Sequence, residues 1–304
     1  MRPLSFIIIT YNRPEDMLAL AGNIAGLDRA SELLEEVIIL NNASTSDYTS
    51  VKDFIFTRQD IPFRYLDAPS NLGVARGRNY AIERSKAPIL IMLDDDAEMG
   101  NADCLVNLVR LFEEQPGSRP LAIISFKVVY FETREMQRNA LPHKNFDAYK
   151  DKHTFDTYYY AGGAHAIRRS VLDQVGKYPE DFFYGMEEYD LAYRILDAGW
   201  SIRYSDEVVM LHKESPLGRT TKKEKQRMMW VNKSKVAWRH LPKRYFYSTA
   251  FLWSLEYLKK TGFDLAGFFK GWGEVFDIPS KEKHTPVSTV TLEYLHAVNA
   301  RLNY

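Results

Sequence analysis

The chain of 304 residues has one cysteine and no long apolar run. The single cysteine, Cys104, excludes an internal disulfide framework and favours a reducing compartment. No segment of about 18 consecutive apolar residues is present, so no membrane-spanning helix is expected. Met1 is followed almost directly by a short strand-like run, so no secretory signal peptide is expected either. These absences together favour a cytoplasmic location.

The chain also lacks net charge, but its charges are unevenly distributed. Residues 213–304 contain 17 basic and 8 acidic side chains, a net charge of +9, and residues 1–212 therefore carry −9. A basic, aromatic-rich tail thus follows an acidic body. With 45% hydrophobic residues, the length suits one large α/β domain with an appendage, or two domains. We place the boundary between residues 212 and 213.

Apolar strand-like runs alternate with helical stretches through the body. The strands are expected at residues 4–10, 36–40, 63–66, 89–93, 121–131, 164–167, 201–205 and 207–211. The helices are expected from residue 14 onward and over 74–86, 101–115, 170–175 and 187–198. Strands separated by helices form βαβ units of a parallel sheet. Between them, residues 132–157 read as one irregular loop, and a loop of that length is usually functional or mobile.

The most informative segment is an apolar run that ends in three carboxylates. Ile89 to Leu93 lead directly into Asp94, Asp95 and Asp96. In open α/β sheets, ligands bind at the carboxyl ends of the strands. On an extended chain, Asp94 and Asp96 point to one side and Asp95 to the other. Mg²⁺ typically takes one or two carboxylates together with phosphate oxygens, so the segment predicts either such a site or a solvated acidic turn.

A second acidic cluster opens the predicted helix at residues 187–198. Glu187 and Glu188 at a helix start complement the helix dipole, which is one interpretation of them. Asp190 and Arg194 stand one helical turn apart and are predicted to form a structural ion pair.

Five segments, in this order, resemble the motifs of family 2 glycosyltransferases. They are Thr10-Tyr11-Asn12-Arg13, Leu40–Ser44, Asn71–Asn79, the Asp triplet, and Phe183–Arg194 followed by Gly199-Trp200 and His212. The chain is most similar to the subset that includes bacterial rhamnosyl- and galactofuranosyltransferases. The resemblance implies an α/β fold of the GT-A nucleotide-diphospho-sugar transferase type, with a Rossmann-like, mainly parallel sheet flanked by helices. It makes residues 1–212 the catalytic domain and residues 213–304 a helical C-terminal region.

The resemblance also implies which residues hold the nucleotide sugar. They are Thr10, Tyr11, Asn12, Arg13, Asn41, Asn42, Asn71, Gly73, Arg76, Arg78, Asn79, Asp94 and Asp95. Free N–H groups at a helix start near residue 74, with two arginines behind them, suit a diphosphate. The family usually has Asp at the position of Asn41, and an amide both accepts and donates hydrogen bonds. The donor is therefore left open as UDP-, dTDP- or GDP-linked.

For the metal and the base, the resemblance points to residues from three segments. It assigns Mg²⁺ or Mn²⁺ to Asp94, Asp96 and His212, and imidazole suits Mn²⁺. A histidine at a strand end is otherwise a capped surface residue. The base position is Glu188, where the family usually has Asp, with Glu187 beside it.

The segment around residues 158–163 is expected to meet the sugar and the acceptor. Gly162 and Gly163 allow a close approach because glycine has no side chain. The ring of Tyr160 is able to stack on a sugar. The alternative is an aromatic strand packed in the core.

The function implied is that of a metal-dependent, inverting glycosyltransferase with a glycan or lipid-linked acceptor in cell-surface polysaccharide synthesis. The departures at Asn41 and Glu188 leave a non-catalytic nucleotide-sugar-binding or scaffold protein of the same fold as the alternative. A nucleotidyltransferase would need a Gly-rich phosphate loop after the first strand, and its absence argues against that class. A glycosidase would need two opposed carboxylates and no nucleotide site, so that class fits poorly too. No nucleic-acid partner is expected.

The tail is strongly apolar over residues 245–258, and basic residues flank that stretch. They are Lys243, Arg244, Lys259 and Lys260. Such a pattern is compatible with an interfacial surface that touches the inner face of a membrane. A helical hairpin packed on the body and a homodimer contact are the other interpretations.

Overall fold

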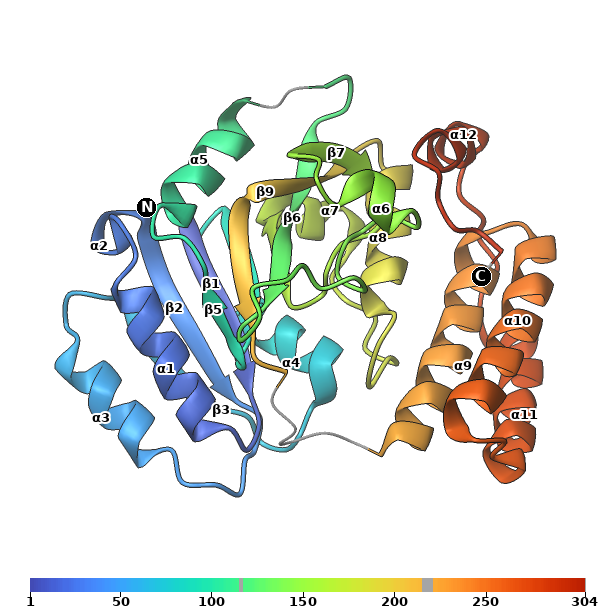
Figure 1. The fold of residues 1–304 in the computed structure, drawn as a ribbon, viewed down its shortest axis with the longest axis horizontal. Coiled ribbons are helices and arrows are strands. Elements are labelled where there is room, and N and C mark those ends of the chain that lie inside the picture. The colour runs from blue at the N-terminus through green and yellow to red at the C-terminus, as the bar shows by residue number, and fades with distance from the viewer. Residues whose placement is uncertain (115–116, 215–220, 304) are drawn as a thin grey trace.

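The computed structural model describes residues 1–114, 117–214 and 221–303 (Figure 1). Its strands are β1 Leu4–Thr10, β2 Leu34–Asn41, β3 Phe63–Asp67, β4 Ile89–Asp94, β5 Ala97–Met99, β6 Leu121–Tyr130, β7 Thr154–Thr157, β8 Ala164–Arg168 and β9 Ser201–His212. Its helices are α1 Pro14–Ala25, α2 Ala30–Leu33, α3 Thr49–Thr57, α4 Gly73–Ile82, α5 Cys104–Glu114, α6 Phe146–Tyr149, α7 Arg169–Val175, α8 Glu187–Asp197, α9 Lys222–His240, α10 Lys243–Thr261, α11 Leu265–Lys281 and α12 Thr289–Ala297. The expected α/β architecture with a helical C-terminal region is confirmed.

The described strands form one sheet with the order β3-β2-β1-β4-β8-β6-β9-β5, and β7 pairs with β9 outside this path. Strands β1 to β4 are parallel to one another, as the βαβ pattern predicts. Strand β8 runs antiparallel to both β4 and β6, and β5 and β7 run antiparallel to β9. The sheet is therefore mixed: its N-terminal half is parallel and its second half carries the antiparallel pairs.

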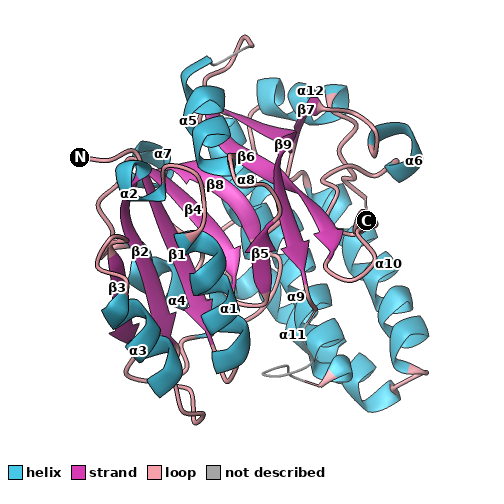
Figure 2. Ribbon diagram, turned by 60° about the vertical axis from the view of Figure 1, so that its left-hand side comes forward, coloured by secondary structure: helices cyan, strands magenta, loops and turns pink. Residues whose placement is uncertain are grey.

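Helices cover both faces of the sheet (Figure 2). Along β1, Phe6 and Ile8 pack in the core with α1 and α5, whereas Ile7 packs in the core on the side of α4 and α8. Because successive side chains of a strand point to opposite faces, both faces of β1 are buried. This is why the strand reads as an unbroken apolar run rather than as an alternating one.

Two expectations about the second half of the body are corrected. Residues 201–211 form the single strand β9 rather than two strands, because the chain bulges between Ser205 and Val209 while it stays paired with β6. The polar pair Asp206-Glu207 sits in that bulge and interrupts the apolar pattern. Residues 132–157 are not wholly irregular, because they contain α6 and β7.

Helix α5 begins three residues later than expected, and residue 115 lies outside the described residues.

Helices α9, α10 and α11 lie side by side next to α8 (Figures 1 and 2). The core cluster that contains Leu191 and Ile195 of α8 continues into Trp230 and Val236 of α9. The C-terminal region is thus packed on the body through apolar side chains. Within the described residues, no helix combines the length and the hydropathy that a membrane crossing requires.

Candidate active site

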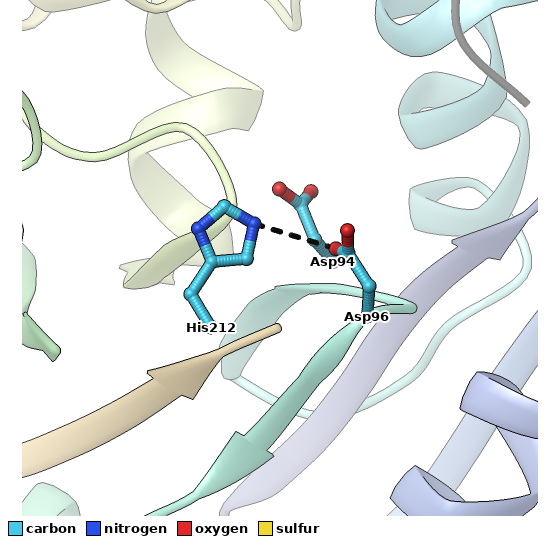
Figure 3. Close-up of side chains that lie close together, drawn as sticks. All are labelled: Asp94, Asp96 and His212. Carbon is cyan, nitrogen blue, oxygen red and sulfur yellow. Dashed lines mark ion pairs between the residues drawn. The ribbon is translucent and has the colours of Figure 1, made fainter. Parts of the chain in front are cut away.

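A three-residue cluster forms where β4, β5 and β9 meet (Figure 3). One ligand atom from each of Asp94, Asp96 and His212 lies within 4.8 Å of the others. His212 is distant in sequence, but it pairs across the sheet with Ala97, the residue after Asp96. Its Nε2 lies 3.5 Å from Oδ1 of Asp96. Two carboxylates and an imidazole form a ligand set that suits Mn²⁺ or Mg²⁺.

A glutamine that the sequence did not single out fixes the ring of His212. Gln137 is buried, and its Nε2 donates to Oε1 of Glu214 at 2.7 Å. Because a carboxylate only accepts, the amide oxygen of Gln137 faces His212, where it lies 2.9 Å from Nδ1. Nδ1 therefore carries a proton, and Nε2 points toward the carboxylates: protonated, it would donate to Asp96, and deprotonated, it would be able to bind a metal ion. This is the orientation in which a histidine binds a metal.

The protonation of His212 depends on the same carboxylates. Burial lowers the pKa of His212, but its hydrogen bond to Asp96 and the charges of Asp94 and Asp96 outweigh burial and raise it. A cation placed among these carboxylates would reverse that balance, because it repels a protonated ring.

Asp95 makes contacts of its own, although the chain turns after Asp94 rather than staying extended, and Arg13 also lies 3.2 Å from Oδ2 of Asp96. Its Oδ1 accepts from Nη1 of Arg13 at 2.7 Å, and its Oδ2 accepts from the backbone N–H of Tyr11 at 3.3 Å. Burial raises the pKa of Asp95 to about 6, and the guanidinium of Arg13 opposes that rise. Asp95 thus ties the loop after β1 to the end of β4.

Arg78 connects the cluster of Asp94, Asp96 and His212 to the start of α8. This side chain of α4 is buried, and its Nη2 lies 3.6 Å from Oδ1 of Asp94. Its Nη1 donates to Oε1 of Glu187 at 3.1 Å. Gly163 also lies against Asp94, so closely that an added Cβ would come within 2.0 Å of Oδ2. Only glycine fits at that position.

Glu188 stands on the same side as Arg78 and Gly162. A Cβ added to Gly162 would lie 3.6 Å from Nη1 of Arg78 and 3.9 Å from Cδ of Glu188. Burial, and then the neighbouring Glu187, raise the pKa of Glu188 to about 8. Oε2 of Glu187 is itself buried without a hydrogen bond. A carboxyl with a raised pKa beside a cleft is a candidate for proton transfer at neutral pH.

A cleft of about 840 Å³ opens over the Asp triplet, Arg78 and His212. Glu187, Glu188, Gly162 and Gly163 were also expected at the site but are not among its lining residues; they adjoin it through their contacts with Arg78 and Asp94. The residues expected at the site that line it are Tyr11, Arg13, Asn42, Asn71, Gly73, Arg78, Asp94, Asp95, Asp96 and His212. Gln137, Glu214 and Lys225 also line it and were not anticipated. Gln137 falls in the stretch expected to be irregular, and Lys225 falls in a basic helix, so neither carried a distinguishing sequence signal.

Several other expected residues bond within the protein beside the cleft. Oγ1 of Thr10 lies 2.6 Å from the hydroxyl of Tyr48, and Oδ1 of Asn12 accepts from the N–H of Thr45 at 2.8 Å. Asn41 donates to Oδ1 of Asp67 at 3.0 Å. These contacts order the loops that form the cleft edge.

The remaining expected residues lie farther into the body. Arg76 donates to the carbonyl of Glu180 at 2.9 Å, and Asn79 donates to the carbonyl of Tyr178 at 2.9 Å. Both fasten α4 to the segment before α8. Tyr160 is 1% exposed, and its ring centroid lies 4.4 Å from that of His165, so its face is turned into the core.

Comparison with known proteins places this site in a family. An uncharacterised protein of Haemophilus influenzae is 28% identical over 177 residues, which are 58% of this chain and 92% of that protein. A low-salt glycan biosynthesis hexosyltransferase of Haloferax volcanii, Agl10, is 24% identical over 210 residues, or 63% of this chain and 61% of that protein.

A solved structure shares the fold. The mannosyltransferase PcManGT from Pyrobaculum calidifontis, in complex with GDP-Man and Mn²⁺, superposes with a TM-score of 0.62 over 98% of this chain and 79% of that chain, at 18% identity. Residues 5–176 of this chain match the family described as Glycosyl transferase family 2. These residues include the Asp triplet, Arg78 and the 160–163 segment, so the chain belongs to glycosyl transferase family 2 and is a glycosyltransferase.

Proposed function

We propose that this glycosyltransferase moves a sugar from a nucleotide diphospho-sugar to a hydroxyl group of the acceptor with inversion at the anomeric carbon. The observation that supports the proposal is the chain of contacts that runs from Asp94 through Arg78, both of which line the cleft, to Glu187 at the start of α8, where Glu188 follows. It sets a site for a charged diphosphate beside a carboxyl group with a raised pKa. Transfer by one displacement needs the leaving diphosphate and the base on opposite sides of the anomeric carbon, so the sugar would lie between the diphosphate and Glu188.

The cluster of two carboxylates and one imidazole suits the divalent cation that would assist departure of a nucleotide diphosphate. Asp94, Asp96 and His212 would hold Mn²⁺ or Mg²⁺, and such an ion supplies charge compensation for the departing nucleotide diphosphate. The fixed Nδ1–H of His212 supports this assignment, because it leaves Nε2 available as a ligand. The related mannosyltransferase structure contains Mn²⁺ together with its donor.

The reaction is then a displacement in which the protein positions the nucleotide diphospho-sugar, the acceptor hydroxyl and the base. Tyr11, Asn42 and Asn71 line the cleft where the nucleotide would lie. The acceptor oxygen bonds to the anomeric carbon as the bond from that carbon to the diphosphate breaks. Glu188 takes the proton of the acceptor hydroxyl, and the nucleotide diphosphate leaves with the bonding electrons.

The acceptor we propose is a glycan or lipid-linked sugar of a cell-surface polysaccharide, reached at an anionic membrane surface. Exposed apolar side chains gather on α10, α11 and the turn between them. They are Tyr247, Phe251, Leu252, Leu255, Phe263, Leu265, Phe269 and Phe276, which we call the apolar face. Lys243, Arg244, Lys259 and Lys260 flank its α10 part, so its charge complements anionic lipids.

Nucleotide binding tests the donor site. We expect UDP, GDP or dTDP to raise the melting temperature of the protein in a way that depends on Mn²⁺, since a ligand stabilises the state that binds it. The nucleotide that gives the shift identifies the donor class. His212→Ala should remove the Mn²⁺ dependence, whereas His153→Ala, at an exposed histidine that pairs with Asp206, should keep it.

Two other results would count against the proposal. Absence of a shift with every nucleotide would argue against a donor site of this type. A nucleotide-dependent shift without any turnover of the matching nucleotide sugar would favour a non-catalytic binding protein of the same fold.

A further inference from the structure

Lys233 of α9 is a buried lysine beside the start of α8. The residue is 7% exposed, and its Nζ lies 3.2 Å from the ring centroid of Tyr189. Tyr189 directly follows Glu188, and its ring stacks on Tyr159 with centroids 4.8 Å apart and planes 13° apart. The ammonium of Lys233 thus reaches from the C-terminal region to the residues around the proposed base.

In the described part of the chain, the contact that the ammonium of Lys233 makes is with the face of the Tyr189 ring. Among the described residues, no carboxylate comes within salt-bridge distance of it and no hydrogen bond to it is formed. Burial of an ammonium is costly, and a nearby negative charge would offset that cost further than the ring of Tyr189 does alone. Burial lowers the pKa of Lys233 to about 7, the charge of Glu188 opposes that fall, and Arg301 adds to it.

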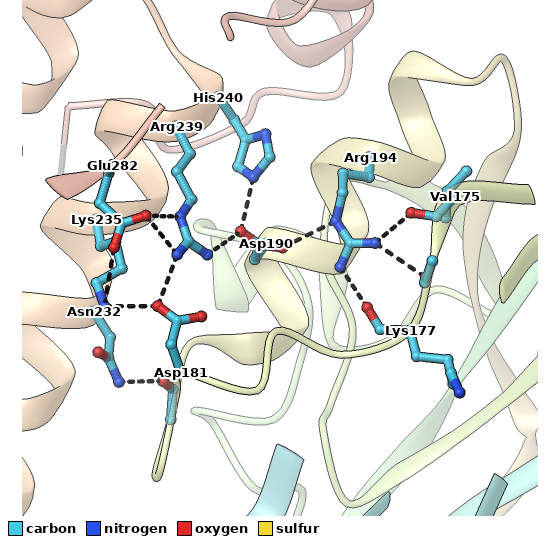
Figure 4. Close-up of polar contacts among 12 residues, drawn as sticks. Val175, Lys177, Asp181, Asp190, Arg194, Asn232, Lys235, Arg239, His240 and Glu282 are labelled. Carbon is cyan, nitrogen blue, oxygen red and sulfur yellow. Dashed lines mark hydrogen bonds and ion pairs between the residues drawn. The ribbon is translucent and has the colours of Figure 1, made fainter. Parts of the chain in front are cut away.

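Helix α9 is held against α8 by polar contacts on both sides of Lys233 (Figure 4). Nδ2 of Asn232 donates to the carbonyls of Tyr184 and Gly185, both at 3.0 Å, immediately before α8. Two turns further on, Arg239 and His240 contact Oδ2 of Asp190 at 3.2 and 2.9 Å. The position of Lys233 relative to Glu188 is therefore set by contacts that do not involve Lys233 itself.

We propose that Lys233 is a positioning residue for Glu188: its ammonium favours the ionised carboxylate and so makes α9 part of the transfer reaction. The inference rests on the proposed role of Glu188 as the base. Glu187 works in the opposite direction, because it repels a second negative charge on α8. Arg78 also faces Glu188, but it already contacts Glu187 and Asp94.

The groups that face this pair are few, so the effect of each charge can be separated. Those around Glu188 are Glu187 and Tyr189 on α8, Arg78 on α4, Lys233 on α9, and the tyrosines Tyr159, Tyr160 and Tyr178. Those around Lys233 are Glu188, Tyr189 and Arg301. Removal of the lysine charge should raise the pKa of Glu188, and removal of the glutamate charge should lower that of Lys233. By linkage the two changes should be equal.

The experiment is a ¹³C NMR titration of the full chain, labelled at the side-chain carboxyl carbon of Glu and at Cε of Lys. We expect Lys233→Met to raise the pKa of Glu188, and Glu188→Gln to lower the pKa of Lys233 by the same amount. Lys233→Arg should leave Glu188 close to its wild-type value. Lys235→Met is the matched control, because its ammonium pairs with Asp181 at 2.8 Å and not with Glu188.

The catalytic consequence is measured as turnover of the nucleotide sugar whose nucleotide stabilises the protein. Below the pKa of a base, each increase of one in that pKa lowers the ionised fraction about tenfold. Lys233→Met should therefore shift the rising limb of the pH–rate profile to higher pH, and turnover should recover as the pH is raised. A purely structural role would lower the rate equally at every pH.

The outcomes separate this inference from the proposed function. Normal turnover in Glu188→Gln would overturn the base assignment and, with it, the role of Lys233. Loss of turnover in Glu188→Gln, with no change of the Lys233 titration in that variant, would overturn only the inference. This second measurement keeps Lys233 in place, so it holds even if Lys233→Met fails to fold.

Discussion

Gly163 brings the backbone so close to Asp94 that one added methyl group would occupy the space of the carboxylate. The distance from an added Cβ to Oδ2 is 2.0 Å, and the neighbouring Cγ would lie at 2.2 Å. Real Cβ atoms do not approach other atoms so closely, and Asp94 is also held by Arg78. Substitution must therefore move the carboxylate out of the cluster with Asp96 and His212.

We predict that Gly163→Ala weakens Mn²⁺ binding by at least about tenfold, because one of three protein ligands is displaced, a change that costs about 1.4 kcal/mol or more. Calorimetric titration with Mn²⁺ in the presence of the stabilising nucleotide measures this affinity. Gly22→Ala is the control, because a Cβ at Gly22 meets nothing within 4 Å. Equal Mn²⁺ affinity in the two variants would show that Asp94 is not a ligand.

Among the elements, the strands of the N-terminal half and their polar ends were the most predictable part. Ile89–Asp94 and Leu4–Thr10 are buried on both faces, so the apolar run alone defined each strand to within one residue. The pairing of Thr10 with Asn41 and of Ile9 with Asp94 brings their polar ends together. A parallel register therefore predicted this edge of the cleft from local sequence.

The antiparallel half was less predictable, because its contacts depend on long-range pairing. His212 meets Asp96 through the pairing of β5 with β9, and no local pattern specifies that register. Gln137 joins the site because its backbone N–H donates to the carbonyl of Val128 at 2.9 Å, which folds the loop back along β6. A lone polar residue in a polar stretch gives no sign of such a contact.

Gln137 offers a test of this part of the fold. We predict that Gln137→Ala lowers Mn²⁺ affinity about 10- to 100-fold, as is usual when a hydrogen-bond partner of a metal-binding histidine is lost. The reason is that Nδ1 of His212 loses its acceptor, so the ring is free to turn or to change its protonated nitrogen. The same calorimetric titration applies, with Gln59→Ala as an exposed glutamine control. An unchanged affinity would mean that His212 is oriented by other contacts.

At the scale of the whole molecule, the sequence indicated a body and a tail, and the structure shows how closely the two are packed. Apolar residues of α8 and α9 share one core, and Asp190 accepts from groups of both α8 and α9. Burial alone would raise the pKa of Asp190, but His240, Arg194 and Arg239 lower it below its usual range. The basic charge of α9 is thus partly used to hold α8 in place.

The basic residues of α10 have a different setting, because they flank the apolar face rather than the body. Phe251, Phe269 and Phe276 are 55%, 70% and 74% exposed, although large aromatic side chains are normally buried. Complete burial of one such side chain is worth about 1.5–3 kcal/mol, so several together suffice for reversible attachment to a bilayer. Each basic residue near an anionic surface adds about 1 kcal/mol.

We therefore predict that the protein sediments with vesicles that contain anionic lipid, and more weakly with neutral vesicles or at high salt, where charges are screened. The triple variant Phe251→Ser, Phe269→Ser, Phe276→Ser should bind at least about tenfold more weakly, since it loses apolar area at three positions. Phe56→Ser is the matched control, because Phe56 is 77% exposed on α3, in the body.

Two results would contradict this prediction. If the wild-type protein does not bind vesicles but is dimeric, and the triple variant is monomeric, the apolar face contacts a second copy of the chain instead. Because the nucleotide shift is measured without vesicles, it should be the same in the triple variant and the wild type. A loss of that shift would place the three side chains in the support of the cleft rather than at a membrane.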